Sequence, residues 1–185
     1  MYELIILSLL MRGPAHGYMV AKVINNIIGP MARASNGRIY PLLNNLVAAG
    51  QIAVEEQEEN GRQVRTYRIT DEGRSRFRQL MMDTSSNPRE YVEIFSFKAT
   101  VLWLLNPDDR LHLIDHYIHF CRAHILHLRD GLKGFQCRTG GSSPRTDALI
   151  SVMTHRVRQW ELELEWGESL RAQVESDPTT AGGQA

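Results

Sequence analysis

The first fifty residues carry apolar side chains at helical spacing in three consecutive segments. Residues 2–11 are almost wholly apolar, which predicts a buried helix. A second apolar stripe predicts a helix over about 16–28. A third helix should begin with Ser35 or Asn36 as its cap, and it should end before Gly50, a residue suited to the position after a helix C-terminus.

The apolar period then changes from helical to alternating. Ile52 and Val54 alternate with polar residues, and Asn60-Gly61 is a hairpin turn signal because both residues tolerate positive φ. The return strand is marked by Val64, Tyr67 and Ile69. Thr70 is suited to cap a fourth helix that runs to about Met82.

The remainder of the chain has the pattern of long helices. A polar break at 83–87 precedes a fifth helix over about 87–105, and a sixth helix is expected over about 107–133. Glycine, serine and proline make 134–145 a predicted loop, and a last long helix should cover about 146–175.

Three helices followed by a hairpin and a further helix predict a winged helix-turn-helix. In that arrangement the third helix enters the major groove of DNA and the hairpin lies on the backbone. We therefore expect a mostly α chain with an α+β N-terminal part. Residues 1–83 would be the DNA-binding domain, residues 84–175 an all-helical dimerisation and effector domain, and residues 176–185 a disordered tail.

The third helix also has polar side chains of the kind that contact base edges. Those candidates are Ser35, Asn36, Arg38, Asn44 and Asn45, with Tyr40 among them. Arg62 and Arg65 of the hairpin would contact phosphates, which position a protein without specifying sequence. The alternative is a solvated helix and an ordinary hairpin in another kind of α+β domain.

The distribution of charge slightly favours the N-terminal half as the part that binds nucleic acid. Net charge is zero, but residues 1–82 carry 10 Lys/Arg and 7 Asp/Glu, whereas the rest carries 11 and 14. The first hairpin strand also holds Glu55, Glu56, Glu58 and Glu59, which would repel phosphates. Backbone contacts should therefore be confined to the hairpin tip, and non-specific binding should be weak.

Two stretches, GRIYPLLNNLVAAGQI and GRQVRTYRITDEGR, together with His16-Gly17-Tyr18, resemble the PadR family of transcriptional regulators. The resemblance covers residues 4–82. It implies a dimeric winged-helix regulator, usually a repressor and often released by a small molecule. Residues at positions that the family places at or near DNA are Tyr18, Arg38, Tyr40, Pro41, Arg62 and Arg65.

The second half resembles, more loosely, the longer AphA-like branch of that family, whose C-terminal domain is helical. The segment Phe95-Ser96-Phe97-Lys98 is similar to the linker helix of that branch.

An apolar seam on the last helix is the predicted dimer interface. Its members, spaced by four and three residues as in a coiled coil, are Met153, Val157, Trp160, Leu164 and Gly167. The alternative is packing against the fifth and sixth helices of the same chain, and one stripe can serve both. A homodimer would match a palindromic operator.

Other candidate sites have weaker support. Lys98 lies near Phe95 and Trp103 and could hold a phenolic or aromatic acid effector, although an internal partner or a path to solvent would serve it equally. Four histidines of the sixth helix fall within about 80° at 100° per residue, a spacing that can bind metal, but they lie away from its apolar side and predict a solvated face. They are His112, His116, His119 and His127. We expect no metal and no cofactor.

Two other classes of function were weighed. The sequence has no nucleophile elbow, phosphate loop or HExxH, so we expect no enzyme. A winged-helix protein-interaction module that does not bind DNA remains the main alternative. Cys121 and Cys137 form no CxxC, and the apolar start lacks the features of a signal peptide, so a cytoplasmic protein is expected.

Overall fold

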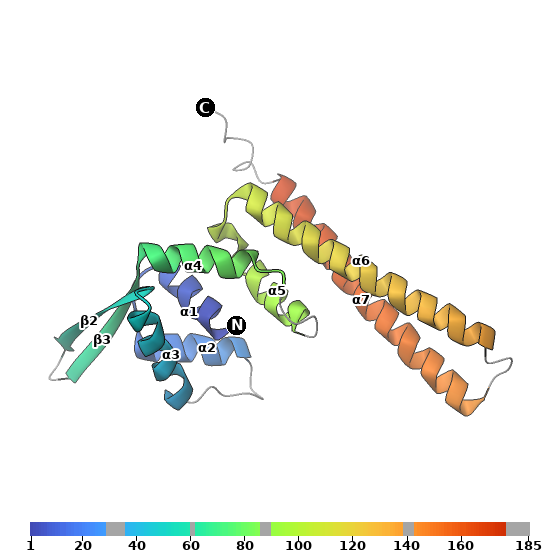
Figure 1. Cartoon of the computed structure of the whole chain (residues 1–185), viewed down its shortest axis with the longest axis horizontal. Coiled ribbons are helices and arrows are strands. Elements are labelled where there is room, and N and C mark those ends of the chain that lie inside the picture. Colours follow the sequence, from blue (N-terminus) through green and yellow to red (C-terminus); the bar gives the residue numbers. More distant parts are fainter. Residues whose placement is uncertain (29–35, 60–61, 86–89, 139–142, 177–185) are drawn as a thin grey trace. The chain divides into compact units, whose positions relative to one another are not determined.

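The computed structural model describes residues 1–28, 36–59, 62–85, 90–138 and 143–176 (Figure 1). They fall into two compact units, Met1–Leu104 and the remainder from Leu105. The elements of the first unit are α1 (Tyr2–Met11), β1 (Ala15–His16), α2 (Gly17–Ile28), α3 (Asn36–Ala48), β2 (Ile52–Glu59), β3 (Arg62–Ile69), α4 (Asp71–Met82), α5 (Tyr91–Ala99) and the 3₁₀ helix η1 (Leu102–Leu104). The second unit consists of α6 (Pro107–Arg138) and α7 (Pro144–Ser176).

The first unit has the expected order of a winged helix-turn-helix, with three helices, a hairpin and a fourth helix (Figure 1). Strands β2 and β3 pair antiparallel from Ile52 opposite Ile69 to Glu59 opposite Arg62. We refer to this hairpin as the wing. The mostly α fold class with an α+β N-terminal part is confirmed.

Strand β1 was not expected from the sequence. Its two residues pair antiparallel with β3, Ala15 opposite Tyr67 and His16 opposite Thr66, so β3 is the central strand of the order β1-β3-β2. We had assigned His16 to the second helix. A two-residue strand leaves no period in the sequence, and only the position of β3 reveals it.

The core of the first unit is built around α1. This helix contacts α2, α4 and β3. Six of its residues are buried, namely Leu4, Ile5, Ile6, Leu7, Ser8 and Leu10. A helix buried on all sides has no polar face, which explains its continuous apolar sequence. Glu3 also accepts two hydrogen bonds from the Arg76 guanidinium, at 2.7 and 3.1 Å, and this pair ties α1 to α4.

The start of α4 is fixed against the end of α3. The Thr70 hydroxyl accepts a hydrogen bond from the Gly73 amide at 3.1 Å and lies 2.7 and 2.9 Å from the carbonyl oxygens of Gly50 and Gln51. Gly50, two residues after the end of α3, has a φ of +68°, as expected for the C′ position of a helix. The predicted cap at Thr70 is therefore confirmed, and it also anchors the entry to the wing.

The fifth helix is shorter than expected, because α5 ends at Ala99 and η1 follows it. The Lys98 amine donates to the Asp83 carbonyl oxygen at 2.7 Å, which joins α5 to the end of α4. This packing joins α5 to the first compact unit, which extends to Leu104. The division into a DNA-binding domain over 1–83 and a dimerisation and effector domain over 84–175 stays a prediction.

The second unit is a hairpin of two long helices that lie side by side (Figure 1). The buried residues of α6 are Leu113, Ile114, Tyr117, Ile118, Cys121 and Ile125. The expected loop over 134–145 was too long, because α6 continues to Arg138 and α7 begins at Pro144. Glycines are tolerated inside a helix that gains its stability from a packed partner. Among the described helices, none has both the length and the apolar character needed to cross a membrane.

Candidate nucleic-acid interface

One side of α3 is buried and the other is polar and exposed. Ile39, Leu43 and Leu46 are buried, because the apolar spacing directs them into the core. The exposed side carries Arg38, Tyr40, Pro41, Asn44 and Asn45, all of them predicted to lie at DNA. Ser35 and the side chains of Asn36 and Arg62 lie outside the described residues.

Arg38 is held by a partner from α1. Its guanidinium lies over the Tyr2 ring, 5.7 Å from the ring centroid. Such a cation–π contact is worth about 0.5–1 kcal/mol at an exposed site. The contact limits the rotamers of Arg38 while its side chain stays exposed.

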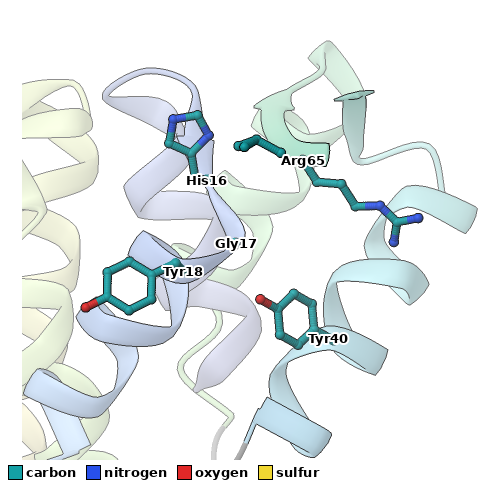
Figure 2. A pocket seen from close by; sticks show the side chains of 6 residues that line it. His16, Gly17, Tyr18, Tyr40 and Arg65 are labelled. Carbon is teal, nitrogen blue, oxygen red and sulfur yellow. The ribbon is translucent and has the colours of Figure 1, made fainter. Parts of the chain in front are cut away.

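A pocket of about 260 Å³ joins the start of α2, α3 and the wing. Figure 2 shows its side chains, and those that line it are His16, Gly17, Tyr18, Tyr40, Val64 and Arg65. Tyr40 projects from α3 with its hydroxyl toward Gly17, and Arg65 extends toward α3 (Figure 2). A Cβ on Gly17 would lie 3.1 Å from Cε1 of Tyr40. Gly17 thus permits the close approach of α2 and α3.

The structure brings together three residues that were predicted to lie at DNA from separate segments, Tyr18, Tyr40 and Arg65. Tyr18 is 73% exposed, an unusual value for a large aromatic side chain. His16 lies beside them, and sequence reasoning had used it only as part of a motif. Its Nδ1 lies 3.0 Å from the Thr66 hydroxyl, across the β1–β3 pairing.

Two glutamates of β2 are paired with arginines of β3. The Arg65 Nε donates to Glu56 Oε1 at 2.8 Å, and an Arg68 Nη2 lies 3.3 Å from Glu55 Oε1. All four side chains are about half exposed. We had expected the acidic strand to act as a source of repulsion. Part of that charge is instead neutralised within the wing, and Arg65 is engaged before any ligand arrives.

Arg65 also lines a second pocket, whose volume is about 260 Å³. It is lined by Asn44, Val47, Ala48, Val54, Glu56, Arg65 and Tyr67. Tyr67 is buried, and its hydroxyl has no hydrogen-bond partner among the described residues. Burial raises the pKa of Tyr67, while the nearby Arg65 guanidinium acts in the opposite direction. The side chain of Arg65, which belongs to the wing, therefore borders the same pocket as Asn44 on the polar face of α3.

The three candidate effector residues have different environments. Phe95 is fully buried, and Lys98 is buried with its amine on the Asp83 carbonyl. Burial lowers the pKa of Lys98 to about 8. Trp103 is 54% exposed, with the Arg12 guanidinium 5.4 Å from its ring centroid. The sequence left open whether Lys98 holds an effector or has a partner within the chain. The structure shows the second arrangement, because the Lys98 amine donates to the Asp83 carbonyl oxygen.

The seam of α7 packs on α6 of the same chain. Trp160 stacks on His124 with ring centroids 4.2 Å apart, and Val157 is buried. A Cβ on Gly167 would lie 3.2 Å from Ile118, and Met153 lies against Gly131. Leu164 is half-buried. The intramolecular alternative therefore accounts for most of the seam, because periodicity identifies an apolar stripe but not its partner.

Polar contacts further fix the register of the helix hairpin. The Tyr117 hydroxyl donates to Glu163 Oε2 at 2.7 Å, and Arg171 pairs with Asp115 at 2.7 Å. Burial, together with the bond to Glu163, raises the pKa of Tyr117. Arg122 pairs with Glu168 at 2.8 Å.

The histidines and cysteines form no centre in the part of the chain that the structure describes. His112, His119 and His127 are exposed and His116 is half-buried. No group of three metal-ligating side chains comes together there. Cys121 is a buried free thiol whose pKa is raised by burial to about 12. The side chain of Cys137 lies outside the described residues.

The first unit therefore has the fold of a winged helix-turn-helix, with an exposed polar helix beside a wing. The model of the transcriptional regulator PadR-like family matches residues 6–79. Residues 6–79 therefore form a domain of the PadR-like family of transcriptional regulators.

Solved structures of family members are similar to the chain. PadR of Bacillus subtilis in complex with operator DNA is 20% identical, with 92% of this chain and 96% of that chain covered and a TM-score of 0.43. The same protein in complex with p-coumaric acid is 21% identical, with 94% and 98% covered and a TM-score of 0.40. A PadR-like transcriptional regulator of Bacillus cereus is 21% identical, with 95% and 99% covered and a TM-score of 0.38. No curated protein matches the sequence.

Proposed function

We propose that this protein is a homodimeric repressor that binds a palindromic operator through α3 and the wing, and that a small aromatic molecule releases it. One observation carries the DNA-binding part of the proposal. The exposed polar face of α3 and Arg65 of the wing border the same two pockets within one compact unit. A duplex whose major groove receives α3 would meet the wing beside it.

Within this interface the side chains divide by chemistry. Arg38, Asn44 and Asn45 have the donors and acceptors for base edges, where arginine suits guanine and asparagine suits adenine. Tyr18 and Tyr40 offer hydroxyls, and these are groups that position a protein on the backbone. Arg65, and Arg62 from the sequence, would add charge to phosphates. Asn36 begins α3, and the N-terminus of a helix favours anions.

Two copies are needed for a palindromic site, and the helix hairpin is the element that would join them. The seam from Met153 to Gly167 is largely used within the chain, so its remaining half-buried parts, Trp160 and Leu164, would be shared with a partner. Leu126 and Leu162 are 62% and 66% exposed and offer additional apolar surface. Apolar side chains exposed on a long helix hairpin support an interface between copies.

The proposal that an effector releases the protein from DNA is supported by the family resemblance and not by a cavity at the candidate effector residues. Phe95 and Lys98 supply a buried aromatic and a buried amine in the first unit, and Trp103 supplies an exposed ring. An aromatic acid could bind there only if Lys98 left the Asp83 carbonyl. This part of the proposal is tested by adding aromatic acids to the DNA-binding measurement below.

The test is binding of the full-length protein to the DNA upstream of its own gene, followed by fluorescence anisotropy. Arg38→Ala should weaken binding by about tenfold or more, because a bidentate base contact is worth about 1–3 kcal/mol. Arg156→Ala is the matched control, because this exposed arginine of α7 carries the same charge outside the first unit. Equal effects of the two substitutions would show that charge alone, rather than α3, controls binding.

The same measurement separates the main alternative. A winged helix that recognises only protein would bind none of the DNA fragments, and selection from a random pool of duplexes would enrich no palindrome. An enriched palindrome that is lost with Arg38→Ala would support the regulator.

A further inference from the structure

We propose that Arg65 changes partners when DNA binds, so that it leaves the carboxylate of Glu56 for a backbone phosphate. Glu56 then acts as an internal competitor of DNA and sets how tightly the protein binds. The inference deepens the proposed function and rests on it. It assigns to the acidic strand a role in controlling affinity, where the sequence suggested only repulsion.

The pair is built into the pairing of the wing. Glu56 and Arg65 stand directly opposite each other on β2 and β3. Opposite charges at such positions attract across the strands. Their atoms approach to 2.8 Å, and the carboxylate offers Arg65 the same kind of charged oxygen that a phosphate does. In the absence of DNA, Glu56 therefore occupies one of the five N–H donors of Arg65 and neutralises the charge that would attract a phosphate.

The pair is weak enough to be exchanged. The two side chains are 54% and 47% exposed. Ion pairs between exposed groups are screened by water and contribute at most about fivefold to an equilibrium. A phosphate of a duplex also brings the release of bound counterions, which the internal pair lacks. The exchange is thus favourable only when DNA lies close against the wing.

Arg65 is placed where such a phosphate would come. Its side chain borders the pocket with Tyr18 and Tyr40, and it also borders the pocket with Asn44 of α3. The exposed face of α3 and the arginine therefore share one surface. A duplex that contacts Asn44 would pass the guanidinium, and the carboxylate of Glu56 borders the same pocket.

The neighbouring pair provides a control within the same hairpin. Glu55 pairs with Arg68, and both are about half exposed. Because side chains alternate along a strand, Glu55 points to the opposite face of the wing from Glu56. Glu55→Gln and Glu56→Gln remove the same charge one residue apart, but only the second frees Arg65.

The experiment measures binding of the full-length protein to its upstream DNA and to a random duplex at several salt concentrations. Glu56→Gln should tighten binding to both, by up to about fivefold for each wing that contacts DNA and roughly thirtyfold for a dimer. Phosphate contacts carry no sequence information, so the ratio between the two duplexes should stay unchanged. Glu55→Gln should change either affinity by less than about twofold.

Arg65→Ala, alone and combined with Glu56→Gln, completes a double-mutant cycle. In that background Glu56→Gln should have no effect, because the released group is missing. Equal gains for Glu55→Gln and Glu56→Gln, or a gain that persists with Arg65→Ala, would overturn the exchange and show general repulsion by acid. If the native protein binds its upstream DNA but Glu56→Gln gives no gain, the exchange is refuted and the proposed function stands. If none of the variants binds any duplex, both are refuted.

Discussion

Gly73→Ala is expected to destabilise the first unit by about 3 kcal/mol, at the upper end of the cost of overpacking. A Cβ at this position would lie 2.0 Å from the Gln51 carbonyl oxygen and 2.8 Å from Ile69 Cγ1. The first distance is far below contact between a carbon and an oxygen. The substitution can be accommodated only if α4 and the start of β2 move apart.

The carbonyl cannot move alone, because three bonds fix the junction. The Gln51 oxygen accepts from the Thr70 amide at 3.1 Å, and the Thr70 hydroxyl lies 2.9 Å from it. The same hydroxyl accepts from the Gly73 amide at 3.1 Å. Moving α4 away from Gln51 would therefore also break the helix cap, which is worth about 1 kcal/mol.

The assay is urea unfolding followed by far-ultraviolet circular dichroism, with Gly134→Ala as the matched control. Gly134 lies inside α6 with no atom within 4 Å of an added Cβ. Alanine there should stabilise the helix by about 0.5–1 kcal/mol. Glycine-to-alanine substitution should thus lower the free energy of unfolding at Gly73 and raise it at Gly134. A Gly73→Ala protein within about 0.5 kcal/mol of the native one would refute the packing argument.

Three further outcomes are expected. Tyr67→Phe should leave stability unchanged or raise it by up to about 1 kcal/mol, because the buried hydroxyl has no partner among the described residues; a large loss in urea unfolding would reveal a missed hydrogen bond. Lys98 has a folded-state pKa of about 8, below its ordinary 10.5, so this site binds more protons in the unfolded chain between these values, and its own contribution to stability should rise by about 3 kcal/mol from pH 8 to 10.5. The raised pKa values of Cys121 and Tyr117 lower the stability of both proteins in the upper part of this range, so the measurement is the difference in free energy of unfolding between the native protein and Lys98→Met. That difference should grow by about 3 kcal/mol from pH 8 to 10.5; parallel profiles would contradict the burial of the amine. Tyr117→Phe should cost about 2 kcal/mol in the same unfolding assay, because Glu163 loses the hydroxyl donor at 2.7 Å; a cost below about 0.5 kcal/mol would show that water replaces it.

The sequence predicted the winged helix well because each of its elements has a local signal. The apolar run of α1, the alternation of Ile52 and Val54 and the cap at Thr70 each depend on residues that are close together along the chain. The predicted turn at Asn60-Gly61 lies outside the described residues. Strand β1 had no such signal, since Ala15 and His16 are in a strand only because β3 lies beside them.

For the candidate site, the sequence indicated which residues could contact DNA but not the ion pairs that these residues form with one another. Arg65 was expected to be a free phosphate ligand, but the register of β2 and β3 places Glu56 opposite it. Register is decided by how the turn and the buried face fit together, and charge alone does not show it. The prediction of a dimer interface on α7 also lacked a partner that the sequence could identify. The spacing of Val157 and Trp160 fits packing on α6 as well as packing on another copy of the chain.

The pairing of β1 with β3 has a consequence for how the chain folds. His16 and Thr66 are fifty residues apart in the sequence, whereas β2 ends at Glu59 and β3 begins at Arg62, so the two strands of the wing are close neighbours along the chain. Closing a long loop costs more entropy than closing a hairpin, and distant contacts slow folding. The wing can therefore form early and on its own, while β1 can join only after α2 and α3 have been ordered between them. Completion of the three-stranded sheet should be the late step of folding in the first unit, and the helix hairpin of α6 and α7, built from neighbours in the chain, need not wait for it.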